Sequence, residues 1–238
     1  MQSINSTIKC ENCVSKGSGI FCHLHDSELV ELDRHKITNK FKKGQTLFVQ
    51  GTPPFGIFCV SSGNVKVTQA GDDGKEAIVR IVKGGDVLGH RSLFTNEYYH
   101  ATATALDDTQ VCFIDKKYIV ELIQQKPSVA SNLLSKLGKS LGAAEAKVSS
   151  FSQKNVRERL AELLLLLKES HGEALDDTET FINIKLTREE MASMIGTASE
   201  TLIRFMTELK QESLIRQDGK KIIITDEARL LEFAGISH

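Results

Sequence analysis

Between residues 38 and 115, apolar and polar positions form short runs of the kind that β-strands make. The runs cover 46–49, 56–60, 65–69, 77–82, 87–88, 101–105 and 111–114. Glycine-containing turns separate them, for example at Gly44, at Gly63 and at Gly84-Gly85. Many short strands at this close spacing predict a small antiparallel barrel or jelly roll.

The apolar residues outside this region recur with helical spacing. Residues 26–36 predict a short helix and residues 155–170 a longer amphipathic one. Over 128–153, a coiled-coil seam with steps of three and four is formed by Leu134, Leu137, Leu141, Ala144, Val148 and Phe151. We expect this helix to pair with a second copy of the chain, because it has no second apolar face. The alternative is a helix that packs only on its own barrel.

Residues 186–219 have the pattern of a helix–turn–helix followed by a β-hairpin. Thr187 stands three residues before Glu190, a capping box that opens a first helix, and Gly196 ends that helix in a tight turn. Thr197 and Glu200 form a second such box, and the helix they open is expected to run to about residue 212. Two short helices followed by a wing predict a shape that enters the major groove of DNA.

Together these elements predict an α+β protein with four parts. They are a cysteine-rich arm (1–25), an antiparallel β-domain (26–127), a pairing helix (128–154) and a winged helix–turn–helix (155–238).

Composition limits the possible functions of the chain. It has 238 residues, 40% of them hydrophobic, and a net charge of −1, so bulk charge does not drive DNA binding. Binding would depend on basic residues grouped on the second helix and the wing, namely Arg204, Lys210, Arg216, Lys220 and Lys221. The start of the chain shows no signal peptide, and the longest apolar run, 163–167, is too short to span a membrane. We expect a cytoplasmic protein whose five cysteines bind metal or react with oxidants.

Two stretches resemble the CRP/FNR superfamily of bacterial transcription regulators. They are FKKGQTLFVQG…GIFCVSSGNVKV in the β-domain and GTASETLIRFMTELKQESLI in the helix–turn–helix. The resemblance extends from about Asp26 to the C-terminus. It implies a cyclic-nucleotide-binding-type β-roll as the sensor domain, a homodimer, a roughly two-fold symmetric double-stranded DNA site and a contact with RNA polymerase.

The same resemblance assigns Glu200 and Arg204 to base reading. An arginine fork donates to guanine O6 and N7, a carboxylate accepts from cytosine N4, and positions i and i+4 share one helix face. The cyclic-AMP branch of the family has an arginine where Ser199 stands here, so TTGA-type half-sites of the oxygen-responsive branch are expected. Thr197, Ser199 and Lys221 are predicted phosphate contacts. The alternative is that Glu200 only caps the helix and Arg204 pairs with Glu200 or Glu208.

The β-roll segment that holds cyclic nucleotides in the family departs from the family pattern here. His90 replaces the glutamate that binds ribose, and His100-Ala101 replaces the arginine–serine pair that binds phosphate. An imidazole does not supply the permanent charge and fork of a guanidinium, so binding of ordinary cyclic AMP is not expected. Arg91 could pair with another anionic effector; the alternative is that His90, Arg91 and His100 form an ordinary solvated loop.

The cysteines resemble those of the oxygen-sensing branch. Cys10, Cys13 and Cys22 lie in the arm, and Cys112 stands at the position of that branch's distant cysteine. Four thiolates with a C-x-x-C nucleus suit an iron–sulfur cluster. Zinc on the same four thiols, or on three of them with His23 or His25, and no cofactor at all remain alternatives. Cys59, inside a strand, is expected to be a buried apolar residue.

Two further features bear on function. The seam has no acidic residue that would hold two helices apart, so pairing could be constitutive. No nucleophile turn or orienting acid accompanies His23 and His25, so we expect no enzyme activity. A winged helix that binds protein in place of DNA is the remaining alternative.

Overall fold

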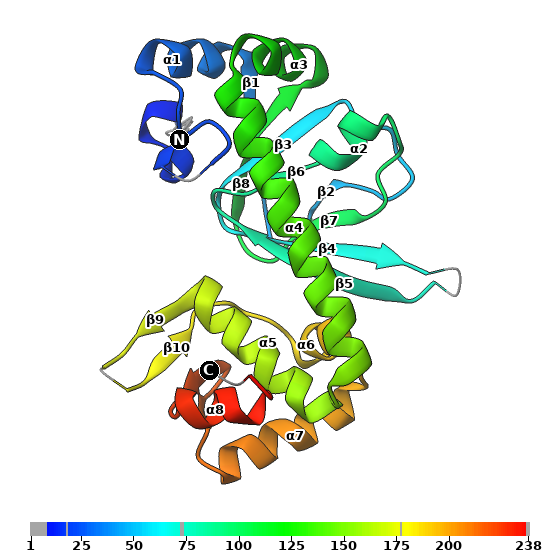
Figure 1. The fold of residues 1–238 in the computed structure, drawn as a ribbon, viewed down its shortest axis with the longest axis vertical. Helices are drawn as coiled ribbons and strands as arrows, with labels where there is room; N and C mark the ends of the chain where they lie inside the picture. The colour runs from blue at the N-terminus through cyan, green and yellow to red at the C-terminus, as the bar shows by residue number, and fades with distance from the viewer. Residues whose placement is uncertain (1–8, 18, 72–73, 177, 237–238) are drawn as a thin grey trace, which may run out of the picture. The chain divides into compact units, whose positions relative to one another are not determined.

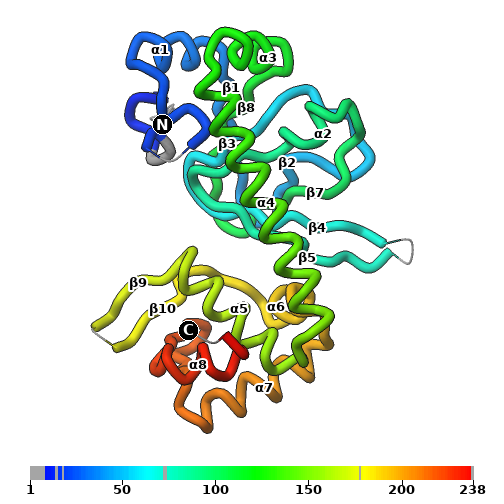
Figure 2. Tube along the Cα trace, viewed as in Figure 1, coloured from blue at the N-terminus to red at the C-terminus, as the bar shows by residue number. Residues whose placement is uncertain are grey.

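The computed structural model describes residues 9–17, 19–71, 74–176 and 178–236. Residues 1–8 of the predicted arm lie outside this part of the chain. The described residues form two compact units, Met1–Leu141 and Gly142–His238, and each is treated by itself below. Figure 1 shows the elements in chain order, and Figure 2 follows the same path as a tube. The boundary between the two units falls inside the long helix α4 (Pro127–Gln153).

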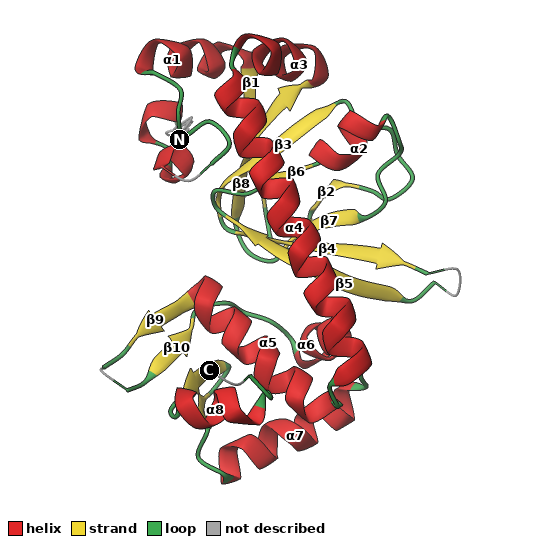
Figure 3. Ribbon diagram, viewed as in Figure 1, coloured by secondary structure: helices red, strands yellow, loops and turns green. Residues whose placement is uncertain are grey.

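The first unit contains a β-roll made of two four-stranded antiparallel sheets, drawn in yellow in Figure 3. One sheet has the order β1-β8-β3-β6 and consists of β1 (Lys36–Phe41), β8 (Thr109–Asp115), β3 (Gly56–Ser62) and β6 (Val87–Leu88). The other has the order β2-β7-β4-β5 and consists of β2 (Thr46–Phe48), β7 (Thr102–Ala105), β4 (Asn64–Ala70) and β5 (Glu76–Lys83). The predicted roll and its seven strands are confirmed, and β1 is an additional strand.

Short helices complete this unit. They are the 3₁₀ turns η1 (Cys10–Asn12) and η2 (Val14–Gly17), then α1 (Asp26–His35), α2 (His90–Thr95) and α3 (Lys116–Gln125). The helix α1 was expected, whereas α2 and α3 were not.

Two apolar clusters stabilise the first unit. The inner one lies between the sheets and includes Val60, Val65 and Val111. The outer one lies on the opposite face of the β1-β8-β3-β6 sheet, where Ile57 and Ile114 meet side chains from the arm, α1, α3 and α4. The arm is therefore packed onto the outside of this sheet.

In the second unit, helices and a small sheet form the predicted winged helix–turn–helix. The helices are α5 (Val156–His171), α6 (Arg188–Ile195), α7 (Ser199–Gln211) and α8 (Glu227–Phe233). The sheet has the order β11-β12-β10-β9, with β11 (Ile215–Asp218), β12 (Lys221–Ile224), β10 (Thr180–Ile182) and β9 (Gly172–Ala174). The wing is thus the edge of a four-stranded sheet, and the loop expected over 172–179 begins with a strand.

The turn between α6 and α7 confirms one expectation and corrects another. Thr187 and Glu190 form the predicted capping box, and Gly196 adopts the left-handed conformation at φ 64°. The second capping box is wrong, because the residue that caps α7 is Ala198 and it supplies no side-chain bond. The Thr197 amide instead donates to the Ala192 carbonyl at 3.0 Å, so Thr197 ends the first helix and does not begin the second.

The predicted seam residues on α4 have different surroundings. Leu134, Leu141 and Val148 are 67%, 61% and 67% exposed in the single chain and recur every seven residues. Ala144 is exposed as well. Leu137 packs partly against the outer cluster of its own unit, as the alternative interpretation expected. The Phe151 ring lies 4.9 Å from the guanidinium of Arg159, and a Cβ at Gly196 would come within 2.6 Å of that ring.

Among the described residues, no helix combines the length and the apolar character that a membrane span requires.

Candidate functional site

The helix α7 divides its side chains between the core and solvent. Leu202, Met206 and Leu209 are buried. Glu200 and Arg204, one turn apart, are both exposed, and Ile203 between them is 49% exposed. The two predicted base-reading side chains are therefore presented on one open face.

The alternative roles proposed for this pair find little support. Glu200 does not cap the helix, because the first turn of α7 has no side-chain cap. Glu208 forms an ion pair with Arg157 at 3.3 Å. Within the described part of the chain Arg204 forms no ion pair, and its guanidinium lies 4.9 Å from the Phe205 ring. Its charge therefore remains available to a ligand outside the chain.

Around α7 lie the predicted phosphate contacts. Thr197 and Ser199 are half-buried in the turn and at the first residue of α7. Lys221 is exposed on the wing beside the left-handed Gly219, with its ammonium 5.2 Å from the Phe181 ring. Arg216 is less available than its neighbours, because it forms an ion pair with Glu179 at 2.5 Å.

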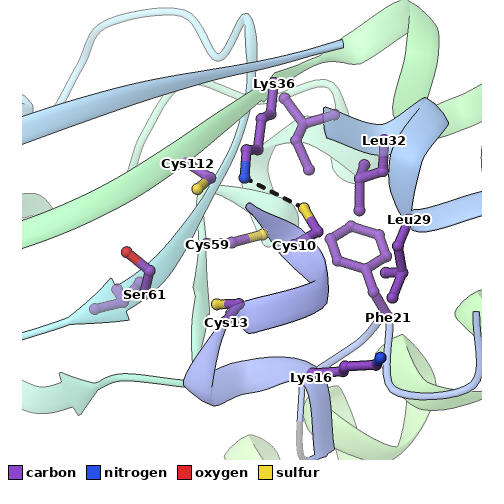
Figure 4. Close-up of a pocket in the computed structure, with 12 residues that line it drawn as sticks. Cys10, Cys13, Lys16, Phe21, Leu29, Leu32, Lys36, Cys59, Ser61 and Cys112 are labelled. Atoms are coloured by element: carbon purple, nitrogen blue, oxygen red, sulfur yellow. Dashed lines mark hydrogen bonds between the residues drawn. The ribbon is translucent and has the colours of Figure 1, made fainter. Parts of the chain in front are cut away.

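A second candidate site lies where the arm covers the outer face of the sheet (Figure 4). A pocket with a cavity volume of about 50 Å³ is lined there by Cys10, Cys13, Cys59 and Cys112, together with Lys36 and several apolar side chains. Cys10 and Cys13 come from the arm, Cys59 from β3 and Cys112 from β8. Three of the four predicted ligands thus meet in one place, and Cys59 joins them.

Polar contacts hold the arm over this pocket. The Cys10 amide donates to the two carboxylate oxygens of Asp33 at 3.0 and 3.1 Å. The buried ammonium of Lys36 forms an ion pair with Asp33 at 2.6 Å and donates to the Cys10 sulfur at 3.4 Å. One cation is therefore placed beside the sulfur atoms, where it would offset the charge of thiolates.

Burial keeps the thiols of Cys10, Cys59 and Cys112 protonated in the absence of a ligand. Burial raises the pKa of Cys10 to about 12. The positive charge of Lys36 lowers this pKa, but by less than burial raises it. Burial also raises the pKa values of Cys59 and Cys112. A metal centre would have to displace these protons, because thiolates and not thiols are metal ligands.

Cys22 does not line the pocket. Its sulfur lies 3.5 Å from Nδ1 of His23 and accepts from Nδ2 of Asn132, on α4, at 3.5 Å. Across the described residues, no three His, Cys, Asp or Glu side chains are grouped closely enough to hold a single metal ion. That arrangement does not favour a preformed tetrahedral zinc site, in which all four ligands contact one ion.

The third candidate region is the expected effector segment. His90 is buried, and its Nδ1 has no hydrogen-bond partner within the described chain. Burial and the charges of Arg80, Arg91 and Lys136 lower the pKa of His90 to about 4. His100 is not part of this group, because its Nε2 contacts Glu97 at 2.9 Å. Lys136 is already paired with Asp86 at 3.0 Å, so Arg80 and Arg91 are the cations that make this region a candidate for an anion.

Acidification is expected to destabilise the first unit through His90. The pKa of His90 in the folded protein lies below the ordinary value of 6.5, which applies to the unfolded chain. The stability that the neutral imidazole contributes is therefore fully present above pH 6.5 and is lost as the pH falls toward 4. The shift corresponds to a loss of about 3 kcal/mol. Urea unfolding at pH 7 and near pH 4 should show a smaller loss for His90→Gln than for the wild type. Equal losses in the two proteins would contradict this role of His90.

Comparison with known proteins places the whole chain among transcription regulators. Residues 38–126 match the cyclic nucleotide-binding domain family, and residues 158–233 match the Crp-like helix-turn-helix domain family. The chain is 31% identical to the transcriptional activator protein FnrL of Cereibacter sphaeroides over 237 residues, covering 95% of this chain and 92% of that protein. It is 26% identical to a CRP-like cAMP-activated global transcriptional regulator of Mycobacterium tuberculosis, covering 90% and 95% of the two. The fold resembles FixK2 of Bradyrhizobium japonicum, with a TM-score of 0.77, 20% identity, and coverage of 85% of this chain and 99% of that one.

Proposed function

Since the chain belongs to the CRP/FNR superfamily of transcription regulators, we propose that it is a homodimer that reads TTGA-type half-sites in double-stranded DNA. Members of this superfamily are not enzymes. We also propose that the protein responds to oxygen or redox state. It would act in the cytoplasm and contact RNA polymerase. The observation that carries the DNA-binding part is the exposed face of α7, where Glu200 and Arg204 lie one turn apart and Arg204 forms no ion pair with the described residues.

The wing and the start of α7 support the same role. Thr197, Ser199 and Lys221 flank the base-reading pair, and phosphate contacts from such positions fix the register of a protein on DNA. Arg204 would donate to guanine, Glu200 would accept from cytosine, and Ser199 leaves the neighbouring base pair without an arginine contact.

The homodimer is supported by the exposed leucines and valine of α4. Their seven-residue spacing matches one row of a coiled-coil seam, and the described residues of the chain leave them largely exposed. Two copies joined along α4 would present two α7 helices to the two halves of a symmetric site.

The redox part of the proposal is supported by the pocket under the arm. Thiols from the arm and from the sheet line one space, with Lys36 beside them, and this donor set suits an iron–sulfur cluster. When bound, such a cluster would supply the centre that oxygen or nitric oxide attacks. Cys10 and Cys13 would hold the arm and Cys112 the sheet, so that loss of the link would release the arm from the face that α4 also covers.

A second candidate signal is an anionic effector in the β-roll. The grouping of Arg80 and Arg91 near the buried His90 favours it, and one relative is a cAMP-activated regulator. His90 in place of the family's glutamate argues against ordinary cyclic AMP.

The test of DNA binding is fluorescence anisotropy with a labelled duplex that carries two inverted TTGA half-sites, prepared without oxygen and again in air. We expect the protein to prefer this duplex over a scrambled one and to lose affinity steeply as salt rises. A protein that binds neither duplex in dilute buffer, in either state, would contradict the proposal.

A further inference from the structure

We infer that Cys59 is the fourth thiolate of the cluster site, with Cys10, Cys13 and Cys112, and that Cys22 is not a ligand. This inference rests on the redox part of the proposed function. It replaces one residue of the ligand set that the family resemblance implies, and the reason lies in the register of two strands.

The strands β3 and β8 pair antiparallel, and Cys59 stands directly opposite Cys112. Directly opposed residues point to the same face of a sheet, with Cβ atoms about 4.5–5.5 Å apart. That face is the outer one, because Ile57, two residues before Cys59, belongs to the outer cluster. The two sulfur atoms therefore reach the same side of the sheet without any rearrangement.

The arm brings the other two cysteines to this face. η1 begins at Cys10, where Asp33 and Lys36 hold the residue, and the Cys13 amide donates back to the Cys10 carbonyl at 3.2 Å. The next turn, η2, contacts β3 itself. Figure 4 shows Cys10, Cys13, Cys59 and Cys112 around the same pocket.

The four cysteines are not preformed as a site for a single ion. A tetrahedral ion needs its ligands gathered around one point, and the described residues show no such group. The four cysteines line one pocket, and four thiolates are the ligand set of an iron–sulfur cluster, so their side chains would adjust as a cluster binds.

Cys22 has a different environment. Its sulfur is engaged by Asn132, whose amide also donates to the Ile20 carbonyl at 3.1 Å. The side chain thus faces α4, and its neighbour Phe21 is the residue that lines the pocket. Moving Cys22 into the pocket would require breaking its contact with Asn132.

The matched variants Cys59→Ser and Cys22→Ser test the inference. Each is reconstituted without oxygen with ferrous iron, sulfide and thiol reductant, and iron, sulfide and absorbance near 400 nm are measured per chain. We expect Cys59→Ser to lose cluster affinity by at least about tenfold, since removal of an outer-shell partner alone has a cost of that order. Cys22→Ser should keep the iron and sulfide content of the wild type.

Cys59→Ala serves as a second variant, because it suits an apolar strand position, and thermal unfolding of each apo variant shows that the roll is intact. Retention of the cluster by Cys59→Ala and its loss from Cys22→Ser would overturn the inference. A wild type that takes up no iron, or that forms a Cys59–Cys112 disulfide in its place, would overturn it too. DNA binding is measured separately, so failure of the regulator proposal would be recognised independently.

Discussion

Replacing Arg204 with alanine is expected to remove sequence preference at one guanine of each half-site. A good bidentate contact discriminates by about 1–3 kcal/mol, and a dimer on a symmetric site would lose two of them, roughly 2–6 kcal/mol in all. The exposed guanidinium has no ion pair to lose within the described chain, so the fold should be unaffected. Anisotropy with the TTGA duplex and with single-base variants of it measures the loss.

Two matched variants distinguish base-specific contacts from nonspecific electrostatic attraction to DNA. Arg204→Lys keeps the charge but not the fork, and should recover only part of the preference. Lys220→Ala removes an exposed wing cation and should weaken binding to every duplex to a similar extent. A preference that survives unchanged in Arg204→Ala would assign guanine recognition to another residue.

The sequence predicted those parts of the fold in which the apolar pattern agrees with burial. The strands of the roll, α5 and the first capping box all follow such patterns. The strand β1 was missed because its pattern is inverted at the start, where Lys36 is buried and Ile37 is 61% exposed. The burial of Lys36 depends on Asp33 and the Cys10 sulfur, which are tertiary contacts that periodicity does not reveal.

The candidate sites were predictable to different degrees. Glu200 and Arg204 lie in one helix, where spacing alone places them on one face. Cys59 was expected to be a buried apolar residue, and it does pack against the outer cluster. Its place beside Cys112 depends on the pairing of β3 with β8, and an alignment of these two predicted strands would have been the signal for it. The second capping box was predicted incorrectly for a similar reason, because the actual hydrogen bond joins the turn to the preceding helix. The Thr197 amide donates to the Ala192 carbonyl at the end of that helix.

Replacing Leu141 with glutamate is expected to abolish the dimer and, with it, tight binding to a two-fold site. The side chain is 61% exposed in the single chain, so its replacement should change the stability of the monomer by no more than about 0.5 kcal/mol. In a paired seam, two leucines per dimer would lose roughly 3–6 kcal/mol of apolar burial, and two like charges would face each other. Sedimentation equilibrium of the variant should therefore show a monomer at concentrations where the wild type is a dimer.

Ala146→Glu is the matched control for Leu141→Glu. Ala146 is exposed on the same helix but lies five residues from Leu141, outside the three-and-four spacing of the seam. It receives the same charge, and glutamate is a good helix former at both positions. The control should remain dimeric and bind the TTGA duplex as the wild type does, whereas Leu141→Glu should bind it only as weakly as a single half-site allows. If Leu141→Glu stays dimeric with unchanged affinity, the exposed row on α4 is not the dimer interface, and the two DNA-reading helices would have to be joined by another surface.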